Sequence, residues 1–318
     1  MKNFLFWLEN ARIYSLPITI LNWFVIFIYS IKENGNIFAG LLALVGVSFA
    51  HMATNLIDDY FDYKILIKNE EYVNSAQNCK CAYLRTGKTS VKELQTAIII
   101  FLAIAAATGI LLFFISGCYV ALLALAGLII ALTYQKFSTA GLGEIAVILA
   151  YGPLLYEGIY YVMTSRFSYE VLILSIACAL FTNTILYAHM LMDYDGDECS
   201  HKITLCRKFK NKDNALRFIL VFYTLSFIFV SIYACISNNN FLYLTFITIP
   251  LIADLYRCLK QYNQDKTQLP KIYPWHYPLD SWNKIKNTPE AGFYFRFYYS
   301  RNIVTFFMLL TCIALILK

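Results

Sequence analysis

Charged residues are scarce in this sequence. They make up 14% of its 318 residues, whereas hydrophobic residues make up 59%. A soluble domain carries about 25% charged residues, so the composition excludes an ordinary soluble fold. The formal net charge of +6 does not indicate a nucleic-acid partner, because the basic residues lie in loops between apolar segments. We expect membrane lipid to surround most of the chain and expect no nucleic acid to bind it.

The sequence also lacks repeats, low-complexity segments and cysteine pairs at the spacing of metal sites. The nine cysteines are scattered, and Cys79 and Cys81 form a C-x-C pair with no second pair at zinc-site spacing. We expect no zinc site. We also expect no cleavable signal sequence, because Glu9 and Arg12 interrupt the residues before the first apolar stretch.

Long apolar runs are what the sequence has in abundance. A bilayer core requires about 20 mostly apolar residues per helix. Nine stretches approach or reach this length, at residues 14–31, 37–58, 94–116, 118–135, 143–163, 169–192, 214–236, 241–259 and 300–317. They predict an all-α integral membrane protein of nine transmembrane helices, in which residues 1–318 form a single domain.

Lysine and arginine predict the orientation of these spans. If the N-terminus is cytoplasmic, only Lys32, Arg166 and Lys318 fall on the outer side. The positive-inside rule therefore favours a cytoplasmic N-terminus and an outer C-terminus. The long polar connections, at 63–92, 194–213 and 260–299, then share the cytoplasmic face, and we expect the active site to face that side.

A first group of acidic residues lies where the second span ends. Asn55, Asp59 and Asp62 are four and three residues apart and share one face of a helix, while Asp58 flanks that face. A carboxylate in hydrocarbon costs about 2.5–3.5 kcal/mol, so such a group requires compensation. Carboxylate and amide oxygens suit Mg²⁺ bridged to a substrate phosphate. The alternative is that these acids only mark where the helix leaves the membrane.

A second group lies where the sixth span ends. Asp193 and Asp197 are four residues apart, and His189 precedes them by one turn on the same face. Asp195 lies on another face of an ideal helix and is the weaker candidate ligand. Two carboxylate clusters on one cavity suit a diphosphate held through Mg²⁺. Basic residues near the clusters are candidates for phosphate contacts, although the positive-inside rule alone would also place bases there: Lys64, Arg85 and Lys202.

Four motifs occur in order along the chain. They are N-x-x-[ND]-D-Y-x-D at 55–62, L-R-x-G at 84–87, G-L-G-E…G-P…Y-Y-V at 141–162, and D-x-x-x-D followed by K-x-T-L at 193–205. On these motifs the chain resembles the UbiA superfamily of intramembrane prenyltransferases, closest to the menaquinone-type 1,4-dihydroxy-2-naphthoate branch. The resemblance extends from residue 12 to about residue 220.

The resemblance implies a fold, a reaction and a set of site residues. The fold is a nine-helix bundle around a central cavity that opens laterally to an isoprenoid diphosphate. The reaction is Mg²⁺-dependent transfer of the prenyl group to a small aromatic acceptor. The residues linked to metal would be Asp59, Asp62, Asp193 and Asp197, with Asn55 nearby, and the diphosphate contacts would be Arg85 and Lys202.

Several residues differ from the branch pattern, and these differences bear on the identity of the acceptor more than on the expected metal site. Asp58 stands where the branch often has Asn, Met192 where it commonly has Arg, and Leu66 where other branches have an acid. His189 stands at an Asn position, where it would act either as a base near the acceptor or as a hydrogen-bonded packing residue. A different acceptor therefore stays open.

Two other functions fit parts of the pattern. A terpene cyclase of the same superfamily would ionise the diphosphate and let the chain close on itself. A transporter would use intramembrane acids for ion coupling, but transporters place such groups near the midplane, often in repeated halves. The loop at 269–301 has two interpretations as well: an interfacial anchor with Trp275 and Trp282 at headgroup depth, or a cap over the active site.

Overall fold

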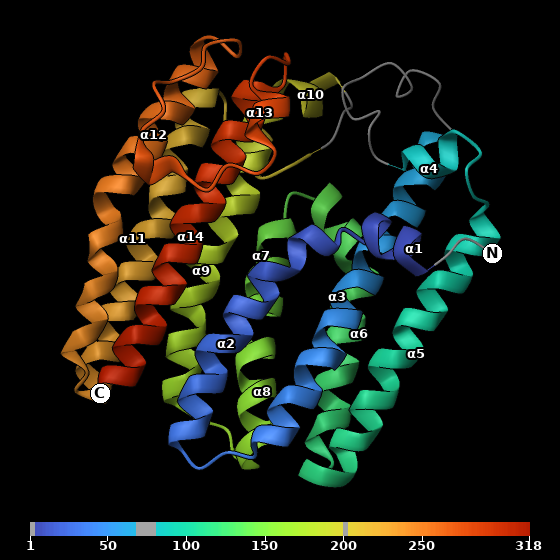
Figure 1. The fold of residues 1–318 in the computed structure, drawn as a ribbon, viewed down its shortest axis with the longest axis vertical. Coiled ribbons are helices and arrows are strands. Elements are labelled where there is room, and N and C mark those ends of the chain that lie inside the picture. Colours follow the sequence, from blue (N-terminus) through green and yellow to red (C-terminus); the bar gives the residue numbers. More distant parts are fainter. Residues whose placement is uncertain (1–3, 68–80, 200–202) are drawn as a thin grey trace.

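The computed structural model describes residues 4–67, 81–199 and 203–318. Within these ranges the regular structure is helical, apart from an isolated parallel bridge between Ala140 and Ile203 (Figure 1). The α-helices are α1 (Phe4–Asn10), α2 (Leu16–Lys32), α3 (Ile37–Leu66), α4 (Ala82–Arg85), α5 (Val91–Ser116), α6 (Tyr119–Thr139), α7 (Gly143–Leu149), α8 (Leu155–Thr164), α9 (Tyr169–Met192), α10 (Tyr194–Cys199), α11 (Lys212–Ser237), α12 (Ile249–Gln264), α13 (Trp282–Ile285) and α14 (Ala291–Leu317). Shorter 3-10 segments are η1 (Ile13–Ser15), η5 (Cys206–Lys208), η6 (Asn240–Thr248) and η7 (Pro274–His276), and η4 (Ala150–Leu154) is a π-helix.

Nine helical stretches of the described chain are long and apolar enough to cross a membrane, which confirms the predicted class and number of spans. They are Ile13–Lys32, Ile37–Lys64, Val91–Ser116, Tyr119–Thr139, Gly143–Thr164, Tyr169–Met192, Lys212–Ser237, Asn240–Gln264 and Ala291–Leu317. The last span starts earlier than the expected residue 300. Polar and charged residues in its first turns hid the helix, and the preceding loop is correspondingly shorter than 260–299.

The helix α9 lies at the centre of the bundle. It packs against α7, η4, α11 and α14, and it is the most deeply buried of the nine spans. A helix that is apolar on every face is typical of such a central position. A separate cluster, which includes Trp7, Leu56, Tyr83 and Phe101, joins α1, α3, α4 and α5 at the side where α3 ends.

The fifth span is kinked between α7 and α8. Gly152 has φ −102° and ψ −109° inside the π-helix, and Pro153 follows it. A Cβ at Gly152 would lie 2.8 Å from the Cβ of Ala179 and 3.2 Å from the carbonyl oxygen of Ser175. Only glycine therefore allows this close approach to α9. The G-P pair of the third motif sets the path of the span past the central helix.

A fully buried arginine fastens the loop between α12 and α14. Arg296 donates from Nε to the carbonyl oxygen of Cys258 (2.6 Å), from Nη1 to that of Gly292 (2.8 Å) and from Nη2 to that of Gln268 (3.1 Å). Its guanidinium also lies over the ring of Tyr262. One side chain therefore joins both helices to the start of the loop.

A carboxylate on α12 holds the middle of the same loop. Asp254 Oδ2 lies 2.8 Å from His276 Nε2 and accepts hydrogen bonds from Trp275 Nε1 and Tyr299 OH, both at 3.2 Å. His276 is fully buried, and its Nδ1 accepts from the backbone N–H of Tyr273. The loop is thus packed onto α12 and α14 through specific polar contacts.

The anchor interpretation of this loop is wrong for one of its two tryptophans. Trp282 is 9% exposed and packs with Cys258, Leu279 and Phe295 in a small apolar cluster. Trp275 is 49% exposed and stacks on Tyr273. Trp282 therefore packs inside the loop, whereas an interfacial role for the exposed Trp275 stays a prediction.

Replacing Arg296 by methionine should destabilise the bundle by about 3 kcal/mol, because three buried carbonyl oxygens lose their donor. The measurement is the unfolding free energy of the purified protein in detergent. Arg257→Met is the matched control, since Arg257 is exposed and pairs only with Asp254 one turn away; we expect a change within about 1 kcal/mol. Equal effects of the two substitutions would contradict the role assigned to Arg296.

Candidate active site

The first acidic cluster lies at the end of α3, and Asp59 is its most buried member. Asp59 is 3% exposed. Its Oδ1 accepts a hydrogen bond from Arg12 Nη2 at 2.5 Å, and its Oδ2 accepts one from the Tyr83 hydroxyl at 2.8 Å. Three segments that are distant in the sequence thus meet on a single carboxylate.

Neither Arg12 nor Tyr83 was among the predicted site residues. Arg12 precedes η1 in a left-handed conformation, φ 59°, and its guanidinium lies 3.7 Å from Asp58 as well. Burial alone would lower the pKa of Arg12, but the carboxylates of Asp59 and Asp58 outweigh it and raise the pKa. Burial, together with Asp59, raises the pKa of Tyr83, which therefore remains a neutral donor. Two features of the sequence could have pointed to them: Arg12 is a lone arginine before the first span, and Tyr83 directly precedes the L-R-x-G motif.

The amide of Asn55 is oriented by its nitrogen. Nδ2 donates to the carbonyl oxygen of Ala11 at 2.9 Å and lies 3.4 Å from Ser15 Oγ. The amide oxygen has no hydrogen-bond partner recorded among the described residues, so it is the ligand atom that Asn55 offers. One turn beyond Asp59, Asp62 Oδ1 accepts from Gln135 Nε2 of α6 at 2.8 Å. The predicted common face of α3 therefore presents side-chain oxygen atoms of Asn55, Asp59 and Asp62. Hydrogen bonds with neighbouring segments hold these side chains in place.

The predicted basic residues near this cluster are exposed. Lys64 lies over the ring of Tyr60, 4.3 Å from its centroid, and Arg85 ends the short helix α4. Lys202, the third predicted phosphate contact, lies outside the described residues. A contact of Lys64, Arg85 or Lys202 with phosphate stays a prediction.

The second acidic cluster lies where α9 gives way to α10. The helix α9 ends at Met192, Asp193 caps it, and the Asp197 N–H donates to the carbonyl oxygen of Asp193 at 2.8 Å. Asp197 is 3% exposed, whereas Asp193 is partly accessible. His189 Nδ1 lies 3.3 Å from Asp193 Oδ2. His189 and Asp193 therefore lie on one face, as predicted, and their side chains are close enough to pair.

Asp195 is directed to different partners. Its Oδ2 lies 2.7 Å from Lys212 Nζ and 2.9 Å from Lys266 Nζ, so it joins the starts of α11 and of the loop after α12. Burial acts to raise the pKa of Asp195, but its contacts with Lys212 and Lys266 outweigh burial and lower it. The chain therefore uses Asp195 to connect two spans.

The donor set fits Mg²⁺ bound partly by substrate. In the part of the chain that the structure describes, no three His, Cys, Asp or Glu side chains lie close enough to form a metal cage. Mg²⁺ is usually held by one or two carboxylates together with substrate phosphates and water, so a complete protein cage is not required. Figure 1 shows α3 and α9 ending toward the same end of the bundle.

Comparison with known proteins identifies the family. A model of the UbiA prenyltransferase family matches residues 14–273. The chain belongs to the UbiA prenyltransferase family. It is accordingly a prenyltransferase and a multi-pass integral membrane protein, as the motifs predicted.

Two curated relatives are 1,4-dihydroxy-2-naphthoate octaprenyltransferases. The one from Haemophilus influenzae is 26% identical over 262 residues, which cover 78% of this chain and 83% of the relative. The one from Escherichia coli is 25% identical over 217 residues, 63% of this chain and 67% of the relative. Both fall in the branch that the sequence motifs resemble.

Solved structures of UbiA proteins share the fold. A UbiA homologue from Archaeoglobus fulgidus bound to GPP and Mg²⁺ has a TM-score of 0.58 at 14% identity, covering 97% of this chain and 99% of its own. The same homologue bound to DMAPP and Mg²⁺ has a TM-score of 0.60 at 16% identity, covering 98% and 99%. A digeranylgeranylglyceryl phosphate synthase structure has a TM-score of 0.60 at 17% identity and covers 98% of each chain.

The third motif of this UbiA protein begins in a turn that packs against the segment after the second acidic cluster. Gly141 has φ +67°, and a Cβ there would lie 2.5 Å from Lys208 Cε and 3.3 Å from the carbonyl oxygen of Ile203. Together with the bridge between Ala140 and Ile203, this contact ties the turn after α6 to the segment that follows the second acidic cluster. Glycine is required there for its conformation and for its size.

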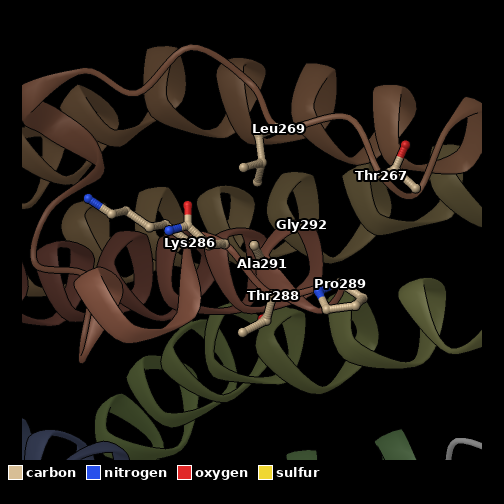
Figure 2. Close-up of a pocket in the computed structure, with 8 residues that line it drawn as sticks. Thr267, Leu269, Lys286, Thr288, Pro289, Ala291 and Gly292 are labelled. Atoms are coloured by element: carbon tan, nitrogen blue, oxygen red, sulfur yellow. The ribbon is translucent and has the colours of Figure 1, made fainter.

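A surface hollow of about 320 Å³ lies between the loop after α12 and the start of α14. Figure 2 shows Leu269 facing Lys286, Ala291 and Gly292 across it. None of the predicted site residues in the described ranges lines this hollow. It is a feature of the loop and is separate from the acidic clusters.

Replacing Arg12 by methionine should destabilise the protein by about 3 kcal/mol, since it leaves the buried Asp59 carboxylate without its charge partner. Adding Asp59→Asn to that variant should restore much of the loss, because the charge that requires a partner is then removed. The measurement is again the unfolding free energy in detergent, with the exposed Lys64→Met as control. A double variant no more stable than Arg12→Met alone would contradict the pairing.

Proposed function

We propose that this protein transfers a polyprenyl group from an allylic isoprenoid diphosphate to a small aromatic acceptor in the membrane, in a Mg²⁺-dependent reaction. The observation that carries the proposal is that the helices α3 and α9, each of which ends in a group of carboxylates, finish toward the same end of the bundle (Figure 1). The relatives named as 1,4-dihydroxy-2-naphthoate octaprenyltransferases support an aromatic acceptor and a menaquinone-type product. The homologue bound to GPP and Mg²⁺ supports the donor and the metal.

In this proposal, residues of both clusters take part in binding the metal and the diphosphate. The amide oxygen of Asn55 and the carboxylates of Asp59 and Asp62 would hold Mg²⁺ at the end of α3, and Asp193 and Asp197 would do so where α9 ends. Bound Mg²⁺ would withdraw charge from the diphosphate as it leaves. Arg12 and Tyr83 keep Asp59 fixed, so that its oxygens are already placed when substrate arrives.

The surroundings of the second cluster suit an allylic cation. The rings of Phe293 and Phe297 on α14 lie 5.2 and 6.0 Å from the His189 ring, so aromatic side chains border the cluster. Aromatic faces stabilise positive charge. In this arrangement His189 is held by Asp193 and is a candidate base near the acceptor.

Replacing each of the four carboxylates Asp59, Asp62, Asp193 and Asp197 by asparagine should reduce prenyl transfer by about 10²–10³-fold, since each substitution removes a charge that holds the metal–diphosphate group. The assay uses protein in nanodiscs, allylic diphosphates of several lengths, Mg²⁺, and 1,4-dihydroxy-2-naphthoate or 4-hydroxybenzoate. Asp213→Asn, an exposed acid at the start of α11, is the control. Diphosphate release without an adduct would instead favour the cyclase, and variants that retain full activity would refute the site.

We also propose that residues 1–318 act as one domain with a cytoplasmic N-terminus, which places both clusters on the cytoplasmic side. In a variant that keeps Cys118, between α5 and α6, as its single cysteine, this residue should react with an impermeant maleimide in intact cells. A cysteine introduced by Lys210→Cys, toward the end where α9 finishes, should react only after permeabilisation. The reverse labelling pattern would contradict the positive-inside assignment.

A further inference from the structure

A polar network extends the first acidic cluster into the bundle. His51 lies on α3, one turn before Asn55. Its Nε2 is 3.0 Å from Ser15 Oγ, and its Nδ1 is 2.5 Å from Thr19 Oγ1 and 3.2 Å from Tyr151 OH. The Tyr151 and Thr19 oxygens are themselves 3.3 Å apart. Side chains from η1, α2, α3 and η4 therefore converge on one imidazole ring.

Hydrogen bonds to neighbouring groups determine which atoms of the network carry protons. The Ser15 hydroxyl donates to the carbonyl oxygen of Arg12 at 2.7 Å, so Ser15 Oγ can only accept from the ring. His51 therefore carries a proton on Nε2 and, as a neutral ring, offers the lone pair of Nδ1. Thr19 is the nearer of two hydroxyls and donates to that lone pair, which leaves Tyr151 to donate to Thr19.

With these protons assigned, the network has fewer hydrogen-bond donors than acceptor lone pairs. The phenolic oxygen of Tyr151 accepts no hydrogen bond from any residue in the described ranges, although it carries two lone pairs. Tyr151 and His51 also remain partly accessible at the convergence of three spans, while Thr19 is buried. A ligand that complements this arrangement brings an O–H group.

The backbone supplies a second, independent observation. Tyr151 is in the π-helix η4, next to the glycine that packs against α9. A π-bulge inserts one residue into a helix and is frequent at functional sites, because it redirects the side chains of that turn. Here it places a tyrosine hydroxyl against His51.

The network also has a defined position relative to the acidic cluster. His51, Asn55 and Asp59 are four residues apart in turn, so they share one face of α3 with a rise of about 6 Å per step. Asn55 Nδ2 lies 3.4 Å from Ser15 Oγ, which joins the two groups directly. The network therefore begins one turn deeper than the residues that would hold the diphosphate.

We propose that Thr19, His51 and Tyr151 form the subsite that binds a hydroxyl group of the aromatic acceptor. The acceptor hydroxyl donates to the Tyr151 oxygen, and the aromatic ring then lies beside the diphosphate end of the prenyl donor. This subsite rests on the proposed function, since it assumes that the second substrate is a hydroxylated aromatic compound. It gives a role to the third sequence motif, which contributes Tyr151.

The test is equilibrium binding of two probes to the full protein in nanodiscs: 4-hydroxy-2-naphthoate, whose hydroxyl is too far from its own carboxylate to bond to it, and 2-naphthoate, which lacks the hydroxyl. Wild-type protein should bind the hydroxylated probe about three- to tenfold more tightly, the difference expected of one hydrogen bond. Tyr151→Phe should reduce that ratio to near one, because it removes the accepting oxygen. Thr19→Val retains the side-chain shape and leaves the Tyr151 hydroxyl with His51 Nδ1 as its acceptor, so it should preserve the ratio. A merely structural defect would weaken both probes alike and leave their ratio unchanged.

Tyr156→Phe is the matched control, since it removes a hydroxyl from the same span that donates to Asn22 Oδ1 and contacts none of Thr19, His51 and Tyr151 among the hydrogen bonds of the described residues. It should preserve the ratio. A wild-type ratio of one, or a ratio unchanged in Tyr151→Phe, would overturn the subsite. Because binding requires no turnover, these results stand apart from the prenyl-transfer assay: absence of transfer from every donor and acceptor would refute the proposed function instead.

Discussion

The burial of the Asp59 carboxylate is the constraint on which much of this structure depends. A charge at the end of an apolar helix requires partners, and α3 cannot provide them from its own turns. Arg12 reaches it from the segment before α2, and Tyr83 reaches it from α4. By satisfying one carboxylate, the chain fixes the start of the first span and the short helix before α5 against the end of the second span.

The second acidic cluster is stabilised by the other half of the molecule. Asp195 joins α11 to the loop after α12 through Lys212 and Lys266. Arg296 in turn holds the start of that loop to α12 and α14. The central helix α9 thus carries its cluster to a point where three later segments are already tied together. The helices α3 and α9, which carry the two clusters, share the main hydrophobic core, while different later and earlier segments complete each cluster.

Much of the fold was predictable because it depends on local composition. Each span is a run of apolar residues long enough to cross a bilayer, and that property needs no knowledge of neighbours. The oxygen-bearing face of α3 was predictable for the same reason, since the spacing of Asn55, Asp59 and Asp62 depends only on helix geometry. The start of α14 was misplaced because Arg296 looks like a loop residue until its three carbonyl partners are known.

The sequence by itself determined the membrane class, the nine spans, the family and the identity of the acidic motifs. The tertiary structure alone decided which side chains complete them: Arg12 and Tyr83 on Asp59, the lysine pair on Asp195, and the convergence of Thr19 and Tyr151 on His51. The physical reason is separation along the chain. Periodicity describes one helix at a time, whereas the partners of a buried polar group come from whichever helices pack beside it.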